Sequence, residues 1–322
     1  MEPIEQLPRV APHECEAAAE VAQRVARNVL SAVQVAEETL ENVLVALFAE
    51  GHVLIEDYPG VGKTALARAL ARSVELHFAR IQCTADLLPA DVVGTNVYNQ
   101  REQRFEFRPG PVFANMVLVD EINRASPKTQ SGLLECMQER SVTVDVHTHE
   151  LARPFIVLAT QNPVEYEGTY PLPEAQVDRF MVRISLGYPS QDHEVAMLAD
   201  HETGDRVLSL EAVADAAEVL SLQDTATRVR ASRALRDYVV ALLRYTREDP
   251  RVELGGSPRA GLMLLRAAKA RAMLQGRDHA LPDDVQALAE SVLAHRLMLA
   301  PEAAGTDPGR VVSDALQTVP AL

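Results

Sequence analysis

The sequence predicts an α/β domain with a parallel sheet, followed by an all-helical domain. Apolar runs typical of buried strands alternate with helical patterns between residues 53 and 184, which favours a parallel sheet covered on both faces. A glycine-rich turn joins the first of these strands to a helix, as phosphate-binding loops do. Beyond residue 188 the patterns are helical and show no convincing strand, so we place a domain boundary there.

The composition bounds the class of protein. The 322 residues exceed what one core usually supports, and 47% of them are hydrophobic, so two folded domains are expected. The formal net charge of −15 argues against a sequence-independent grip on nucleic acid, because such binding needs a basic surface. Cys15, Cys83 and Cys136 match no metal-binding spacing and are expected to be reduced thiols. We find no signal peptide and no apolar run of about 18 residues, so we expect a cytoplasmic protein.

The elements of the first domain follow from hydrophobic periodicity and turn residues. A loose tail is expected over residues 1–15, which hold three prolines and no periodic pattern. Two amphipathic helices are predicted next, and another helix follows the glycine-rich turn. The predicted helices are 16–30, 37–49, 65–72 and 129–139, and the predicted strands are 53–55, 76–81, 116–119, 155–159 and 180–184.

Two hairpins are expected between these strands. Residues 93–113 contain phenylalanines that alternate with charged residues, and Pro109-Gly110-Pro111 ends the pattern. Residues 142–146 alternate valine with polar residues, which indicates an arm of a second hairpin with one apolar face. His147 and His149 fall on the other face by this spacing, where we expect exposed contact residues rather than a metal site.

The second domain is predicted to be helical throughout. A proline- and glycine-containing linker at 301–309 separates its main helices from a short last helix that starts at Val311. The main helices are expected near 190–201, 210–220, 230–245, 258–274 and 282–297.

The glycine-rich turn is the strongest functional signal. Its backbone N–H groups would face a polyphosphate, reinforced by the positive end of the helix dipole. Lys63 would reach the β- and γ-phosphates, and the Thr64 hydroxyl would contact Mg²⁺. Asp57 stands where the usual pattern has its leading glycine, and aspartate is a residue type that tolerates a left-handed backbone. The predicted nucleotide-binding residues are Pro59, Gly60, Val61, Gly62, Lys63, Thr64 and Ala65.

A carboxylate pair supplies the second half of a nucleotide-hydrolysing site. Asp120 ends an apolar strand pattern, where it would hold Mg²⁺ through water, and Glu121 would orient or deprotonate the attacking water. Asn162 lies at the tip of the next predicted strand. It is expected either to hydrogen-bond the γ-phosphate or the attacking water, or to serve as a turn residue before Pro163.

Four longer motifs together resemble one family, the MoxR family of AAA+ ATPases. They are Asp120-Glu121-Ile122-Asn123-Arg124-Ala125, Ala159-Thr160-Gln161-Asn162-Pro163, Leu172-Pro173-Glu174-Ala175-Gln176-Val177-Asp178-Arg179-Phe180 and Gly256-Ser257-Pro258-Arg259-Ala260. The resemblance runs from roughly residue 20 to the end of the chain. It implies a P-loop AAA+ core with a five-stranded parallel sheet of order 5-1-4-3-2 and an all-α lid domain. The domains would be a flexible tail (1–15), the nucleotide-binding core (16–188) and the lid (189–322).

The resemblance also implies roles for single residues. Lys63 and Thr64 match Walker A, and Asp120 and Glu121 match Walker B. Asn162 matches sensor 1, Arg179 the arginine finger and Arg259 sensor 2. The alternative for Arg179 is a salt bridge to Asp178 or Glu174, and the alternative for Arg259 is a structural role. The chain departs from the family at Ala36-Glu37, where Gly-Gln is common near the adenine.

The function implied is Mg²⁺-dependent hydrolysis of ATP to ADP and phosphate at the subunit interfaces of a ring, usually a hexamer. Such a ring is expected to remodel protein clients in a chaperone-like way, often with a von Willebrand factor A-domain partner. A nucleic-acid motor of the helicase type would use the same ATPase site, but the net charge of −15 disfavours it. A small-molecule kinase is disfavoured by the trailing helical domain together with Asn162 and Arg179.

Overall fold

The computed structural model describes residues 10–163, 169–188, 206–303 and 305–321. The chain divides into two compact units. The α/β unit comprises Val25–Leu40 and His52–Ala217, and the helical unit comprises Met1–Arg24, Glu41–Gly51 and Glu218–Leu322. The helical unit therefore includes early parts of the chain, which the continuous domains expected from the sequence do not anticipate.

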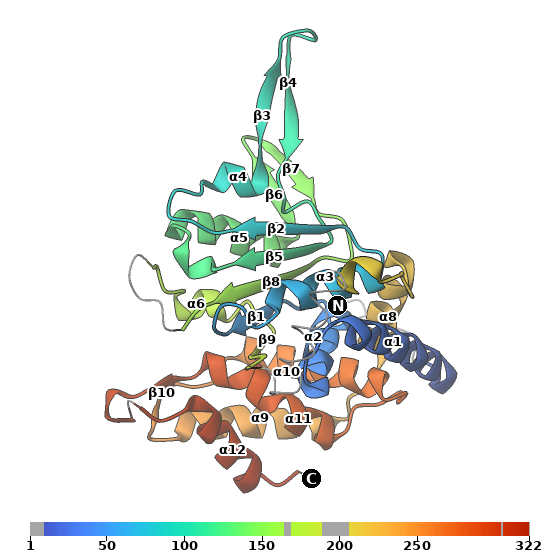
Figure 1. Cartoon of the computed structure of the whole chain (residues 1–322). Coiled ribbons are helices and arrows are strands. Elements are labelled where there is room, and N and C mark those ends of the chain that lie inside the picture. The colour runs from blue at the N-terminus through green and yellow to red at the C-terminus, as the bar shows by residue number, and fades with distance from the viewer. Residues whose placement is uncertain (1–9, 164–168, 189–205, 304, 322) are drawn as a thin grey trace, which may run out of the picture. The chain divides into compact units, whose positions relative to one another are not determined.

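A five-stranded parallel sheet organises the α/β unit (Figure 1). Its order is β2-β5-β8-β1-β9, which confirms the expected order 5-1-4-3-2. The register sets Glu56 of β1 beside Gln161 of β8, and Gln82 of β2 beside Asp120 of β5, so polar residues meet at the carboxyl ends. The strands are β1 (Val53–Glu56), β2 (Phe78–Gln82), β5 (Met116–Asp120), β8 (Ile156–Gln161) and β9 (Val182–Ile184).

Apolar side chains of the sheet and of α5 (Pro127–Glu139) form one core. Val117 and Val157 from the strands lie in the same buried cluster as Leu133 and Leu134 from the helix. Burying a side chain of this size contributes about 1.5–3 kcal/mol. The helix begins at Pro127 because Ser126 caps it, its hydroxyl accepting a hydrogen bond from the Thr129 N–H.

Two hairpins extend the α/β unit, as predicted. After the short helix α4 (Pro89–Val93), β3 (Gly94–Asn99) and β4 (Arg104–Pro109) form a ribbon that projects away from the sheet (Figure 1). β6 (Ser141–Val144) and β7 (His147–Glu150) form the second hairpin. Asn96 of the first hairpin donates a hydrogen bond to Asp145 of the second, at 2.6 Å, so the two are tied together.

The face expected for His149 is wrong. The chain turns at Asp145, which has a φ of 56°, so residues 147–150 run back antiparallel and His149 lies opposite Val142. Residues directly opposite in an antiparallel pair share a face, and His149 is therefore on the valine side. Its ring stacks on Phe107 with centroids 3.9 Å apart. His147 lies opposite Val144, so its expected face is also wrong, although the residue is exposed as expected.

The first helices begin with α1 (Pro12–Ala32), followed by α2 (Glu37–Phe48). The start of α1 differs from the prediction, because the last residues of the expected tail are helical. Pro12 occupies the first helical position, and the Ala11 N–H donates to the Glu14 carboxylate at 2.7 Å. These contacts satisfy the helix start, which periodicity alone did not reveal.

The C-terminal half is mainly helical, as predicted, and one predicted helix is misplaced. The helix expected at 210–220 begins at residue 216, because the backbone N–H groups of Val213 and Ala214 donate to the Ser73 carbonyl instead. The helix expected near 190–201 lies outside the described residues. The helices are α8 (Ala216–Arg228), α9 (Arg233–Glu248), α10 (Pro258–Leu274), α11 (Pro282–Leu293) and α12 (Pro308–Thr318).

The expectation of no strand in this half is also wrong. β10 (Val252–Leu254) and β11 (Met298–Leu299) pair antiparallel, but each is too short to leave a sequence pattern. Within the described ranges no helix is both long and apolar enough to cross a membrane.

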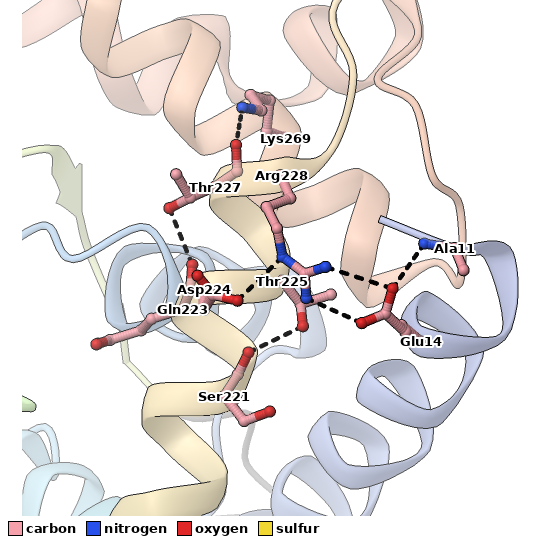
Figure 2. Close-up of polar contacts among 9 residues, drawn as sticks. All are labelled: Ala11, Glu14, Ser221, Gln223, Asp224, Thr225, Thr227, Arg228 and Lys269. Carbon is pink, nitrogen blue, oxygen red and sulfur yellow. Dashed lines mark hydrogen bonds and ion pairs between the residues drawn. The ribbon is translucent and has the colours of Figure 1, made fainter. Parts of the chain in front are cut away.

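Arg228 joins the start of the chain to α8 within the helical unit (Figure 2). Its guanidinium donates to both oxygens of Glu14, at 3.0 and 3.4 Å, and to Asp224 at 3.0 Å. Lys269 of α10 donates a hydrogen bond to the carbonyl of Thr227, the residue before Arg228. The Arg228 side chain is 15% exposed and that of Glu14 is 36% exposed, so this is a half-buried, bidentate contact of the kind that fixes geometry.

Candidate nucleotide site

A pocket of about 220 Å³ lies at the carboxyl ends of the parallel strands. Open parallel sheets bind ligands at this edge. The pocket brings together the loop after β1, the start of α3 (Lys63–Ser73) and residues from β2, β5 and β8. It is lined by Pro59, Gly60, Gly62, Lys63, Thr64, Ala65, Arg80, Gln82, Asp120, Glu121 and Thr160.

The loop after β1 has the backbone expected of a phosphate cradle. Gly60 and Gly62 adopt φ values of 87° and 93°, which residues other than glycine rarely adopt. Gly62 is the residue before α3, so the first N–H groups of an 11-residue helix lie beside the pocket. Such N–H groups and the helix dipole favour a bound anion.

Lys63 points its ammonium back onto the loop. Its Nζ donates to the Asp57 carbonyl at 2.9 Å. Burial lowers the pKa of the Lys63 ammonium, while the carboxylates of Asp57, Asp120 and Glu121 oppose that shift. The Lys63 ammonium and the N-terminus of α3 favour a polyanion, whereas the nearby carboxylates favour a cation beside it.

Asp57 does not behave as the sequence suggested. Its φ is not positive, so the leading position of the loop does not require a left-handed residue in this chain. Instead, its carboxylate is buried, with the residue 3% exposed, and accepts hydrogen bonds from both neighbouring and distant groups. The side chain, rather than the backbone conformation, explains the aspartate.

Asp120 and Glu121 also line the pocket. Asp120 is 6% exposed, and its carboxylate accepts a hydrogen bond from Arg80 at 2.6 Å. Glu121 has a φ of 55°, a strained value for a residue that is not glycine. Its carboxylate accepts hydrogen bonds from Gln82 at 3.1 Å and Arg124 at 3.0 Å.

Thr160 holds the two acidic residues to β8. Its hydroxyl accepts a hydrogen bond from the Glu121 N–H at 2.9 Å and donates to the Asp120 carboxylate at 3.4 Å. Thr160 is 1% exposed, so both contacts are shielded from water. The hydrogen bond from Glu121 to Thr160 on the neighbouring strand therefore stabilises the strained backbone conformation of Glu121.

Sequence reasoning did not find three residues of this pocket, namely Arg80, Gln82 and Thr160. Arg80 and Gln82 lie on β2 with alternate-residue spacing, and Gln82 faces Asp120 in the register. The available signal was the polar alternation at the ends of β2 and β8. It became useful only once the strand order placed these ends beside Asp120.

The remaining predicted residues are placed differently. Asn162 follows β8 and is half-buried, and it is not one of the described residues that line the pocket. Arg179 lies just after α6 (Glu174–Val177) and is half-buried. Arg259 lies in the first turn of α10, in the helical unit.

The residues present suit Mg²⁺. Asp120 and Thr64 both line the pocket and offer oxygen donors, which Mg²⁺ prefers. No cluster of three histidine, cysteine or acidic side chains able to hold a metal occurs in the described ranges. Magnesium at nucleotide sites takes most ligands from phosphates and water, so one carboxylate and one hydroxyl suffice. Cys83 is unsuited as a ligand, since burial raises the pKa of its thiol to about 12.

The sheet order, the phosphate loop and the acidic pair together define a P-loop ATPase of the AAA+ class. Residues 52–182 match the model of the ATPase family associated with various cellular activities (AAA), and residues 244–315 match that of the AAA lid domain.

Known proteins narrow the class further. An uncharacterised Bacillus subtilis protein, YeaC, is 54% identical over 81% of this chain and 81% of its own length. The Mycobacterium tuberculosis protein named chaperone MoxR1 is 42% identical over 88% of this chain and 78% of its own. The crystal structure of a candidate ATPase from Cytophaga hutchinsonii superposes with a TM-score of 0.90 at 37% identity, covering 96% and 97% of the two chains. The chain belongs to the MoxR family of AAA+ ATPases.

Proposed function

We propose that this ATPase binds ATP with its phosphates on residues 59–65 and hydrolyses it with Asp120 and Glu121. The observation that carries the proposal is that one pocket combines the phosphate loop with both carboxylates. Lys63 would bind the β- and γ-phosphates, replacing its contact with the Asp57 carbonyl. Glu121 would accept the proton of the attacking water, and its fixed backbone would orient the carboxylate.

Thr64 and Asp120 would hold Mg²⁺, which when bound neutralises charge on the phosphates. Arg80 would compete with Mg²⁺ for Asp120, because its guanidinium already forms an ion pair with that carboxylate. Asn162 would contact the γ-phosphate or the attacking water from the end of β8. Arg259, at the start of a lid helix, would contribute a further positive charge to the phosphates, as sensor 2 does in the family.

The active form is proposed to be a ring of copies, a hexamer by family resemblance. Arg179 would act on the ATP of a neighbouring copy, where an arginine stabilises charge on the transferring phosphoryl group.

The biological role is proposed to be chaperone-like remodelling of a protein client, in partnership with a von Willebrand factor A-domain protein. The printed name of the relative chaperone MoxR1 supports the general role. The net charge of −15 favours a protein client over nucleic acid. A cytoplasmic location is proposed because all three cysteines are buried free thiols.

A subunit-mixing experiment tests the proposal. Arg179→Ala should abolish turnover alone, and Glu121→Gln should do the same. Mixed in one ring, a Glu121→Gln copy still presents Arg179 to an Arg179→Ala neighbour, whose own Glu121 is intact, so part of the activity should return. Size-exclusion chromatography with light scattering confirms that both variants assemble. Intact mixed rings without any recovered activity would contradict action between copies.

A further inference from the structure

Asp57 carries a set of hydrogen bonds that ordinary phosphate loops cannot make. One carboxylate oxygen accepts from the Leu186 and Gly187 N–H groups and from the Ser185 hydroxyl, at 2.5, 3.0 and 3.2 Å. The other accepts from the Tyr58 N–H at 3.2 Å. All four partners donate to the side chain, so a carboxylate, which accepts at both oxygens, satisfies them better than a neutral amide of this size. With 3% of the residue exposed, water cannot replace these contacts.

The backbone of Asp57 makes two further contacts that matter for nucleotide binding. Its N–H donates to the Gln161 carbonyl at 3.1 Å, and its own carbonyl accepts from the Lys63 ammonium at 2.9 Å. The residue therefore fixes the loop to β8 on one side and to residues 185–187 on the other. A shift of Asp57 would move the point from which Lys63 reaches the phosphates.

An aromatic contact also links the phosphate loop to the chain that follows β9. Tyr58 and Tyr188 stack with centroids 5.5 Å apart and planes 17° apart. Both rings are exposed, at 44% and 69%, so burial alone does not explain their pairing. Two successive residues of the loop thus contact the chain that follows β9.

We propose that Asp57 is a positioning residue for nucleotide binding: its carboxylate locks the phosphate loop to residues 185–187 and so sets where the Lys63 ammonium meets the phosphates. This role rests on the proposed nucleotide site. It explains why the chain has aspartate where a left-handed backbone is not needed. Asp57 acts through Lys63 and through the loop N–H groups, and its carboxylate does not itself line the pocket.

Asp57→Asn is the informative substitution, because it keeps the shape and inverts half of the hydrogen-bonding pattern. With the amide oxygen toward residues 185–187 the new N–H₂ faces the Tyr58 N–H, and in the other orientation it faces the Leu186 and Gly187 N–H groups, so at least one backbone donor loses its acceptor in either case. Glu56→Gln is the matched control. Glu56 also ties β1 to the β9 strand, through Arg183 at 3.1 Å, but it does not line the pocket or hold Lys63. Ser185→Ala removes one of the four bonds and serves as a milder variant.

Steady-state ATP hydrolysis and binding of a fluorescent ADP analogue are measured for the full-length chain. The temperature is one at which circular dichroism shows each variant folded. Asp57→Asn should raise KM and the ADP Kd by at least about tenfold and lower kcat by less than about threefold. Ser185→Ala should show a smaller shift of the same kind, and Glu56→Gln should leave both constants within about twofold of wild type.

The split between KM and kcat separates positioning from simple loss of fold. A variant that is only partly folded has less active enzyme, so its apparent kcat falls while KM stays unchanged. That outcome for Asp57→Asn, or a wild-type KM, overturns the positioning role while ATP binding stands. If wild-type protein neither binds nor hydrolyses ATP, the proposed nucleotide site and the role of Asp57 are both overturned.

Discussion

Replacing Thr160 by valine tests whether strain at Glu121 serves catalysis. Valine keeps the size of threonine but removes the buried hydroxyl that the Glu121 N–H needs at 2.9 Å. A buried donor left without a partner costs about 1–3 kcal/mol. If that cost falls on the arrangement of Glu121 in the transition state, kcat should fall by roughly tenfold or more, since each 1.4 kcal/mol is tenfold.

Thr160→Ser is the matched control for this experiment. Serine keeps the hydroxyl and loses one buried methyl group, at a cost of about 0.8 kcal/mol. Thr160→Val should therefore lose at least as much stability in urea unfolding as Thr160→Ser, and only Thr160→Val should lose turnover. ADP binding should stay within about threefold of wild type in both, because the phosphate loop is not altered. The reasoning is refuted if Thr160→Val hydrolyses ATP as fast as Thr160→Ser.

Two further substitutions address charges. Arg80→Gln removes the cation that pairs with Asp120, so Mn²⁺ should bind about fivefold more tightly without nucleotide, near the upper limit for a half-exposed ion pair. Unchanged Mn²⁺ binding, followed by electron paramagnetic resonance, would show that the pair does not restrain the metal site. Hydrogen bonds from Arg228 and the Ala11 N–H lower the pKa of Glu14 from 4.5, so its stabilisation is present above that pH and is lost as the pH falls through the lowered value. Glu14→Gln should lower the melting temperature at pH 7, and this difference should shrink as the pH falls below 4.5 through the lowered pKa of Glu14; a constant difference would exclude the ionised contact as its source.

The sequence predicted those parts of the site that are local in the chain. The phosphate loop, its lysine and the Asp120-Glu121 pair each occupy a few consecutive residues with distinctive chemistry. The strand order followed from the family resemblance, and the structure confirms it. Strands and long helices were also found, because hydrophobic periodicity reports which side of an element is buried.

Contacts that depend on register could not be read from one sequence. Gln82 and Thr160 reach Glu121 only because β2, β5 and β8 are aligned as they are. The face of His149 depended on a two-residue turn, whereas the prediction continued the alternation of β6 past that turn without a reversal. Asp57 was interpreted only through the backbone conformations that aspartate tolerates. Its side-chain partners at 185–187 lie 128–130 residues away in the chain, so one sequence does not reveal them.

Turnover of a Glu121→Gln variant, followed from a single pre-bound load of radiolabelled ATP, tests the central claim most directly. The account predicts that this variant retains ATP as tightly as wild type, because its phosphate loop and Lys63 are unchanged. Release of labelled phosphate should be at least about 100-fold slower, as expected when a general base is removed. Phosphate release at the wild-type rate would contradict the assignment of Glu121 and with it the proposed mechanism.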